Sequence, residues 1–193
     1  GVTSPIEHAA VSVTIPDYRH DYTRKNLFHL GAMNWRPNVE AVETILKYLP
    51  VWLENDDDIH FTIAGMQSEE RYDHLADDSI SVAGFVPDIK EFVHSQGILV
   101  APIQSGSGVR IKILEMMALG VPIITTTLGA QGIADEPGVL LADNHESLAE
   151  AIYTLRDDEK KRSALGKKAK SIITLHHNSE TISKKILEFI KRK

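Results

Sequence analysis

The chain of 193 residues has no cysteine, which excludes disulfide bridges, thiol catalysis and cysteine-ligated zinc. No apolar run approaches the roughly 20 residues that a membrane-spanning helix needs. Basic residues are fewer than acidic ones, 21 against 27, and the formal net charge is -6. Because nucleic-acid binders normally carry a basic surface, this balance predicts that nucleic acid is not a partner.

The composition, with 42% apolar and 25% charged residues, is ordinary for a globular protein. From residue 27 onward, short apolar runs alternate with longer stretches that have a helical pattern. The runs predict strands at 27–30, 59–64, 79–83, 97–102, 121–125 and 138–142, and the stretches predict helices near 37–53, 68–76, 88–95, 109–119, 145–156 and 158–175. The runs are apolar throughout, as expected where both faces of a parallel sheet are buried. The sequence therefore predicts an α/β fold: a Rossmann-like, doubly wound parallel sheet with helices on both faces and a C-terminal helical tail.

Sheets of this kind bind ligands outside the carboxyl ends of their strands. Three predicted loops at that edge are unusual: GAMNWRPN at 31–38, GFVPD at 84–88, and QSGSG at 104–108. In the third loop, glycines that allow a close approach precede a helix whose free N–H groups favour an anion such as phosphate. Neither a P-loop nor a complete dinucleotide GxGxxG motif is present, which disfavours a nicotinamide dehydrogenase.

The helix behind the third loop begins with charged residues. Arg110 is expected in its first turn, where the guanidinium reaches over a phosphate. Lys112 and Glu115 are expected about 60° apart on one helix face. The simpler alternative for Lys112 and Glu115 is an ordinary surface ion pair.

The stretch SGSGVRIKILEMMALGVPIITTTLGAQGI, together with GAMNWRPN, resembles the donor-binding signature of group 1 glycosyltransferases (glycosyltransferase family 4), which have the two-domain GT-B fold. The resemblance is strongest over 84–133. It implies the C-terminal half of a GT-B fold, cut from a longer protein. The expected divisions are an interdomain linker at 1–26, a nucleotide-sugar-binding domain at 27–178, and a C-terminal helix at 179–193 that crosses back to a missing N-terminal domain.

The resemblance also implies roles for individual residues. Glu115 is expected to accept hydrogen bonds from the ribose, the backbone around Gly108 to meet the diphosphate, and the backbone at Val86 to meet the base edge. Arg36 is the candidate cation for the diphosphate, helped by Arg110 or Lys112, in place of a metal ion. The complete set of expected donor-binding residues is Gly31, Arg36, Val86, Gly106, Ser107, Gly108, Val109, Arg110, Lys112 and Glu115.

By the same resemblance, the whole protein is expected to be a hexosyltransferase. It moves a sugar from a nucleoside-diphosphate sugar to an acceptor, retains the anomeric configuration, and uses no cofactor or metal. Its expected partners are the sugar nucleotide and the missing N-terminal domain. Its expected location is the cytoplasm, with contact to the inner face of the membrane through the missing half. The chain alone is expected to bind donor weakly and to transfer no sugar.

Two positions depart from the family pattern. Ser107 stands where the fuller pattern has a glutamate eight residues before Glu115, and Ala32 stands where many members carry arginine. Both departures favour an alternative, a non-catalytic nucleotide-binding module that keeps the fold. A third alternative is another GT-B enzyme, such as a sugar-nucleotide epimerase, although the first loop and the linker tell against it.

Overall fold

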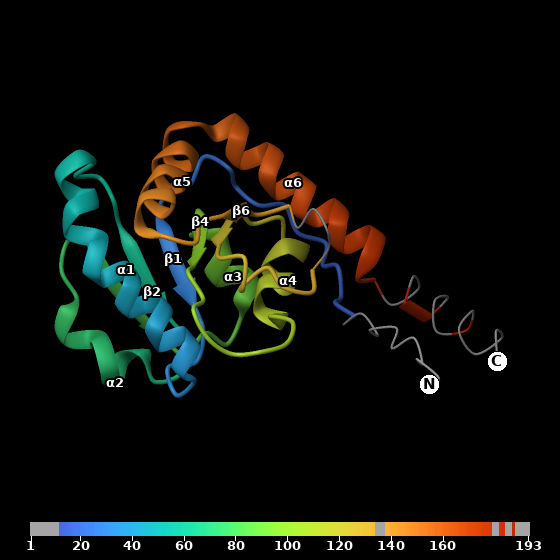
Figure 1. Ribbon diagram of the computed structural model, residues 1–193, viewed down its shortest axis with the longest axis horizontal. Helices are drawn as coiled ribbons and strands as arrows, with labels where there is room; N and C mark the ends of the chain where they lie inside the picture. Colours follow the sequence, from blue (N-terminus) through green and yellow to red (C-terminus); the bar gives the residue numbers. More distant parts are fainter. Residues whose placement is uncertain (1–11, 134–137, 179–181, 184–186, 188–193) are drawn as a thin grey trace, which may run out of the picture.

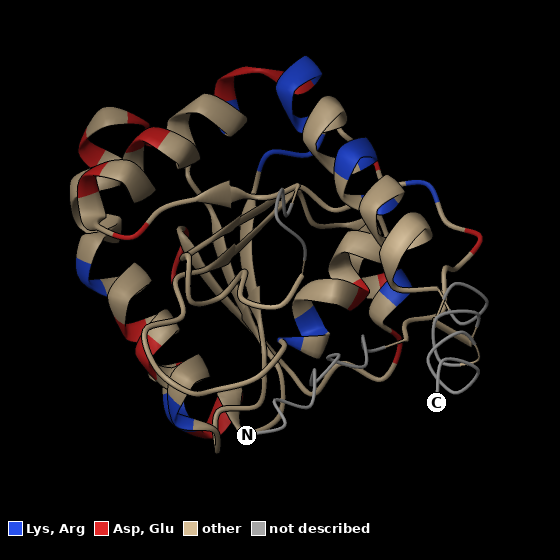
Figure 2. Ribbon diagram, turned by 45° about the vertical axis from the view of Figure 1, so that its right-hand side comes forward, with Lys and Arg blue, Asp and Glu red and all other residues tan. Residues whose placement is uncertain are grey.

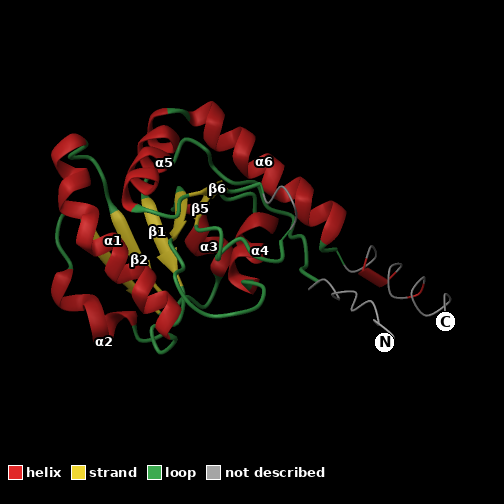
Figure 3. Ribbon diagram, viewed as in Figure 1, coloured by secondary structure: helices red, strands yellow, loops and turns green. Residues whose placement is uncertain are grey.

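The computed structural model describes residues 12–133 and 138–178, together with 182, 183 and 187. Its strands are β1 (Leu27–Leu30), β2 (Phe61–Ala64), β3 (Ile80–Gly84), β4 (Ile98–Ala101), β5 (Ile123–Thr125) and β6 (Leu140–Leu141). Its helices are α1 (Arg36–Asn55), α2 (Ser68–Tyr72), the 3-10 turn η1 (Asp73–Leu75), α3 (Ile89–His94), α4 (Ile111–Ala118), α5 (His145–Asp157) and α6 (Glu159–His176). Figure 3 shows the alternation of strands and helices that the apolar runs predict. The helix expected at 179–193 lies almost wholly outside the described residues.

The six strands form one parallel sheet in the order β3-β2-β1-β4-β5-β6. The chain starts at the centre, builds outward through β2 and β3, and then returns to the other side of β1 with β4. The point where this order reverses lies between β1 and β4, and in doubly wound sheets it opens a crevice at the carboxyl ends of the strands. Strand β1 pairs with β2 over four residues, but its pairing with β4 comprises only Leu27 with Ile98 and Phe28 with Leu99.

Helices cover both faces of the sheet, as Figure 1 shows. One core cluster joins the sheet to α3, α4 and α6, and the other joins it to α1 and α5. Successive residues of β1 belong to opposite clusters, because side chains alternate across a strand: Leu27 belongs to the cluster with α1, and Phe28 packs its ring against Phe92 of α3 in the other cluster. Both faces of the sheet are therefore buried, and the predicted α/β fold class is confirmed.

The segment at 12–26, which precedes β1, packs along this domain. The Tyr22 hydroxyl donates to Gly120 O at 3.1 Å, and Nε of the buried Arg162 donates to Tyr22 O at 2.8 Å. Val13 N donates to His177 O at 2.8 Å, so the incoming segment meets the end of α6. Within the described part of the chain, no helix has the length and apolar character needed to cross a bilayer.

Candidate functional site: a crevice at the reversal of strand order

The loop between β4 and α4 has a conformation that its glycines make accessible. Gly106 and Gly108 have φ values of +93° and +81°, in the region that side-chain-bearing residues rarely adopt. A Cβ atom on Gly106 would also lie 3.3 Å from Pro37 Cγ and 3.5 Å from the ring of Trp35. The small residues therefore let this loop, called the glycine loop (residues 102–110) below, pass close to the start of α1.

Arg110 lies just before α4, and the prediction that it occupies the first turn is wrong. It is the N-cap residue, with an extended backbone (φ -83°, ψ 90°), and the helix begins at Ile111. This geometry turns the side chain back onto its own loop: Nη1 donates to Ser107 O at 2.8 Å and to Gly108 O at 2.5 Å. The residue is only 6% exposed, and this burial lowers the pKa of its guanidinium below the ordinary value.

Lys112 and Glu115 share one face of α4, as predicted. Lys112 Nζ lies 2.9 Å from Glu115 Oε2, and the two side chains are 40% and 38% exposed. The Oε2 atom itself is shielded from solvent, and the approaching ammonium does not meet hydrogen-bond geometry. The ion-pair alternative is therefore observed, and a ligand hydroxyl at Glu115 has to share its carboxylate with Lys112.

Arg36 is the first residue of α1, and its side chain is 87% exposed. Its Nε lies 2.6 Å from Glu40 Oε1, while Ser105 Oγ donates to the other Glu40 oxygen at 2.5 Å. The Ser105 hydrogen bond, and then Arg36, hold the pKa of the Glu40 carboxyl below its usual value. Glu40 therefore ties α1 to the glycine loop, a role that the sequence analysis missed.

The loops after β1 and β2 press against each other. A Cβ atom on Gly65 would lie 1.9 Å from Gly31 O, and Gly65 has a φ of +125°. At Gly31 an added Cβ would meet the Asn38 side chain at 2.3 Å. Asn38 Nδ2 in turn donates to Ala32 O at 3.0 Å, which fixes the first loop on α1. Because neither glycine carries a side chain, the first loop lies directly against the loop after β2 and against Asn38.

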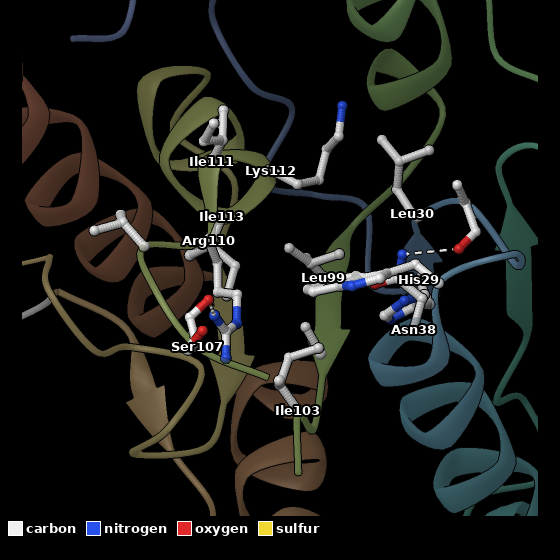
Figure 4. Close-up of a pocket in the computed structure, with 15 residues that line it drawn as sticks. His29, Leu30, Asn38, Leu99, Ile103, Ser107, Arg110, Ile111, Lys112 and Ile113 are labelled. Atoms are coloured by element: carbon white, nitrogen blue, oxygen red, sulfur yellow. Dashed lines mark hydrogen bonds between the residues drawn. The ribbon is translucent and has the colours of Figure 1, made fainter. Parts of the chain in front are cut away.

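A cavity of about 280 Å³ opens between the ends of β1 and β4, at the reversal of strand order. Figure 4 shows Arg110 and Ser107 together on one side of it, and His29 and Asn38 on the other. Its lining comes from β1 and the first loop, from the start of α1, from β4 and the glycine loop after it, and from the start of α4. The lining residues are His29, Leu30, Gly31, Ala32, Trp35, Asn38, Leu99, Ala101, Ile103, Ser107, Val109, Arg110, Ile111, Lys112 and Ile113.

His29 is a cavity residue that the sequence analysis did not single out. Its Nδ1 lies 2.9 Å from Val100 O, and burial lowers the pKa of the ring, so a neutral imidazole donates through Nδ1. The side chain thus bridges β1 to β4 beyond the last paired residues, Phe28 and Leu99. The available signal was a histidine inside the apolar run LFHL.

The predicted donor-binding residues divide into two groups. Gly31, Ser107, Val109, Arg110 and Lys112 line the cavity, while Arg36, Val86, Gly106, Gly108 and Glu115 lie outside its lining. Gly106 and Gly108 belong to the loop that carries Ser107 and Val109, and Glu115 pairs with Lys112. Val86 is separate from both groups. It is half-buried against the core cluster that contains α3, α4 and α6, and its neighbour Phe85 is 67% exposed.

Charge is unevenly distributed over the molecule, as Figure 2 shows. Four lysines lie exposed along α6: Lys160, Lys161, Lys167 and Lys168. The cations that line the cavity are Arg110 and Lys112. Among the described residues, no group of three His, Cys, Asp or Glu side chains is placed to hold a metal ion.

The run Asp56–Asp58 lies at the end of α1, far along the chain from the glycine loop. Asp56 Oδ2 lies 2.7 Å from Nε of Arg156, whose side chain is 1% exposed, and Asp58 lies 2.5 Å from Lys25 Nζ. The Arg156 hydrogen bond lowers the pKa of Asp56, and the Lys25 bond lowers the pKa of Asp58. These carboxylates join α1 to α5 and to the segment before β1.

The family model described as "Glycosyl transferases group 1" matches residues 24–158. The chain belongs to the group 1 glycosyl transferases. This match confirms the family resemblance inferred from the glycine loop and the α4 helix. No curated protein matches this glycosyl transferase domain significantly.

Solved structures of GT-B glycosyltransferases resemble the domain in fold. Over 92% of this chain, TarM of S. aureus matches with a TM-score of 0.73 and 18% identity. Anabaena HepE, solved in complex with UDP, matches over 88% with a TM-score of 0.67 and 17% identity. The chain spans 37% of TarM and 49% of HepE. It covers 88% of the C-terminal domain of a Francisella tularensis group 1 protein, LpcC, which matches over 81% of this chain with a TM-score of 0.61 and 18% identity.

Proposed function

We propose that this domain binds the nucleoside-diphosphate sugar of a glycosyltransferase. The observation that carries the proposal is the cavity at the reversal of strand order. The first loop, the glycine loop and the start of α4 enclose this cavity. This position is where doubly wound sheets hold nucleotides. The family membership and the UDP complex of the related HepE fold support the same ligand class.

The ligand is expected to lie across the loop with its diphosphate at the backbone of Ser107, Gly108 and Val109. Helix α4 directs its N-terminal dipole at the same place. Lys112 faces the cavity and exchanges part of its pairing with Glu115 for phosphate oxygens. Glu115, released in this way, accepts hydrogen bonds from the ribose, and the backbone at Val86 meets the base.

Sugar transfer develops negative charge on the departing nucleoside diphosphate. Fixed backbone N–H groups and the Lys112 ammonium stabilise that charge without a bound metal ion. Arg36 is a second cation, once its bond to Glu40 is exchanged for phosphate. We propose that the whole enzyme retains the anomeric configuration of the sugar, with a hexose as the transferred group.

The domain matches less than half of the TarM and HepE chains, so the acceptor site is assigned to a further domain. The chain alone is expected to bind the donor weakly and to transfer no sugar. We propose that the whole protein lies in the cytoplasm and that the further domain contacts the inner face of the membrane.

A non-catalytic nucleotide-binding module is the second candidate. Ser107 and Ala32 favour it, because each stands where the family pattern carries a charged residue. Single-turnover hydrolysis of the donor by the whole protein separates the two candidates: turnover supports the transferase, and binding without turnover supports the module.

The test of donor binding is calorimetric titration of the chain with UDP, GDP and ADP, repeated on Glu115→Ala. Loss of a charge-assisted hydrogen bond to the ribose is expected to cost roughly 1.5–3 kcal/mol, or about ten- to a hundredfold in affinity. The control is Glu146→Ala, an exposed carboxylate on α5, which is expected to bind as the parent does. If no nucleotide binds, or if both variants bind equally well, the assignment of Glu115 is wrong.

A further inference from the structure

Two of the three guanidinium nitrogens of Arg110 donate to its own loop, whereas Nε is buried and has no acceptor among the described residues. Nη1 donates to Ser107 O at 2.8 Å and to Gly108 O at 2.5 Å, and Nη2 donates to Ser105 O at 3.3 Å. Three carbonyl groups of one short loop thus converge on a single buried cation. The guanidinium also lies over the Trp35 ring, with Cζ 5.9 Å from the ring centroid.

The direction of these carbonyls decides the direction of the neighbouring N–H groups. In a trans peptide, the C=O of one residue and the N–H of the next point in opposite directions. The N–H groups of Gly106, Gly108 and Val109 are therefore directed away from the guanidinium. Within the described part of the chain, none of these three N–H groups has a hydrogen-bond acceptor. They form a set of free donors in a loop that lines the cavity, an arrangement suited to an anion.

The start of this loop is tied to α1 by Gln104 Nε2, which donates to Thr44 Oγ1 at 2.8 Å. Gly106 and Gly108 both have positive φ values, which glycine adopts readily but does not prefer over others. The bond from Ser105 to Glu40 fixes the same end of the loop. Arg110 fixes the other end and supplies the positive charge that keeps three carbonyl oxygens pointing inward.

We propose that Arg110 is a positioning residue, which holds the glycine loop so that its N–H groups receive the diphosphate, and that the guanidinium does not contact the phosphate. The proposal rests on the proposed function, and it reassigns a residue first expected to reach over the phosphate. Both Nη1 hydrogens are already donated to carbonyls. Movement of the guanidinium toward a ligand would leave those carbonyls without their donor.

The test compares Arg110→Gln and Arg110→Lys with Lys112→Gln as the matched control. The readout is the 15N heteronuclear NOE of the amides at 106–109 in the chain without ligand. Both Arg110 variants are expected to lower these values to those of a mobile loop, and Lys112→Gln is expected to leave them unchanged. Both Arg110 variants are also expected to weaken UDP binding about tenfold, because lysine keeps the charge but cannot bridge three carbonyls.

Two results overturn the proposal. One is an ordered loop in Arg110→Gln. The other is Arg110→Lys binding UDP as tightly as the parent chain, which indicates that the charge acts directly on the phosphate. If the chain binds no nucleotide at all, donor binding fails, whereas the loop order without ligand still decides the role of Arg110.

A measurement on the unaltered chain covers the case in which the Arg110 variants unfold. The guanidinium N–H resonances of Arg110 are recorded with and without UDP. Retention of the same slowly exchanging resonances supports bonds to the loop carbonyls in both states. A new through-bond coupling between these nitrogens and the UDP phosphorus would show direct contact and would rule out the proposal.

Discussion

Replacement of Asp56 by asparagine tests the ion pair that joins α1 to α5. Arg156 is buried, with its side chain 1% exposed, and its Nε lies 2.7 Å from Asp56 Oδ2. Removal of one partner from a fully buried ion pair costs roughly 3–5 kcal/mol, and loss of a hydrogen bond to a charged group costs roughly 1.5–3 kcal/mol. Because Asp56 is 23% exposed, and because Arg156 also donates to Lys25 O, the lower range applies. We expect a loss of about 2 kcal/mol.

Urea denaturation measures this loss. With a slope of about 2 kcal/mol per molar urea, the midpoint of Asp56→Asn is expected to fall by about 1 M. The control is Asp57→Asn, which changes an exposed neighbour in the same acidic run and is expected to stay within about 0.5 kcal/mol of the parent. Equal midpoints for the two variants would mean that the buried guanidinium does not depend on Asp56.

The same pair predicts the behaviour in acid. Arg156 lowers the pKa of Asp56 in the folded chain. A depressed folded pKa contributes stability that is fully present above the unfolded value of about 3.9 and is lost as the pH falls through the folded value. The advantage of the parent chain over Asp56→Asn is therefore constant near neutral pH and shrinks below about pH 4. A gap that stays constant down to pH 2 contradicts this origin of the stability.

Three further predictions concern the loops, the incoming segment and metal dependence. Gly65→Ala is expected to destabilise the chain by about 3 kcal/mol or more, because its Cβ would lie 1.9 Å from Gly31 O. The control Gly108→Ala has open space around it and is expected to cost only the roughly 1–2 kcal/mol of a positive φ. Equal urea midpoints for the two variants would contradict the steric explanation. His20 is buried and its pKa is lowered to about 4, so stability is expected to fall by up to ~3 kcal/mol as the pH drops from 6.5 toward 4. His20→Gln should flatten that profile, while His74→Gln, an exposed control, should not. EDTA is expected to leave UDP affinity unchanged, and weaker binding in its presence would contradict metal-independent binding.

The strands and their parallel arrangement were predictable because burial on both faces demands continuous apolar runs. LFHL, GILVAP and VPIIT mark β1, β4 and β5 within a few residues. The position of the crevice followed from the same reasoning, since strand alternation with helices fixes the edge where ligands bind. The glycine loop was recognised there because its residue types are unusual for a connection.

The directions of individual side chains were not predictable. Arg110 and Lys112 are two cations separated by one residue, yet only Arg110 folds back into the loop, because the N-cap residue has an extended backbone. The sequence pattern does not distinguish an N-cap from a first-turn position. A shift of one residue in the start of α4 therefore changes the inferred role of Arg110.

Contacts between distant parts of the chain were also beyond the sequence. Glu40 and Ser105 are 65 residues apart, and their hydrogen bond depends on how α1 lies over the sheet. Likewise, Asp56 lies in an acidic run that resembles a solvated turn. Its partner, Arg156, is separated from it by 100 residues and lies on another helix.

The bond from Val13 N to His177 O has a mechanical consequence. It joins the segment that leads into the domain to the end of α6, so a load applied between residues 13 and 177 acts on this bond first. Such a load pulls on the Val13–His177 bond and on the buried ring of His177, whose Nε2 lies 2.7 Å from Ile133 O. The six strands lie outside this direct line of force, so such a load reaches the two ends of the described domain before it reaches the sheet and its crevice.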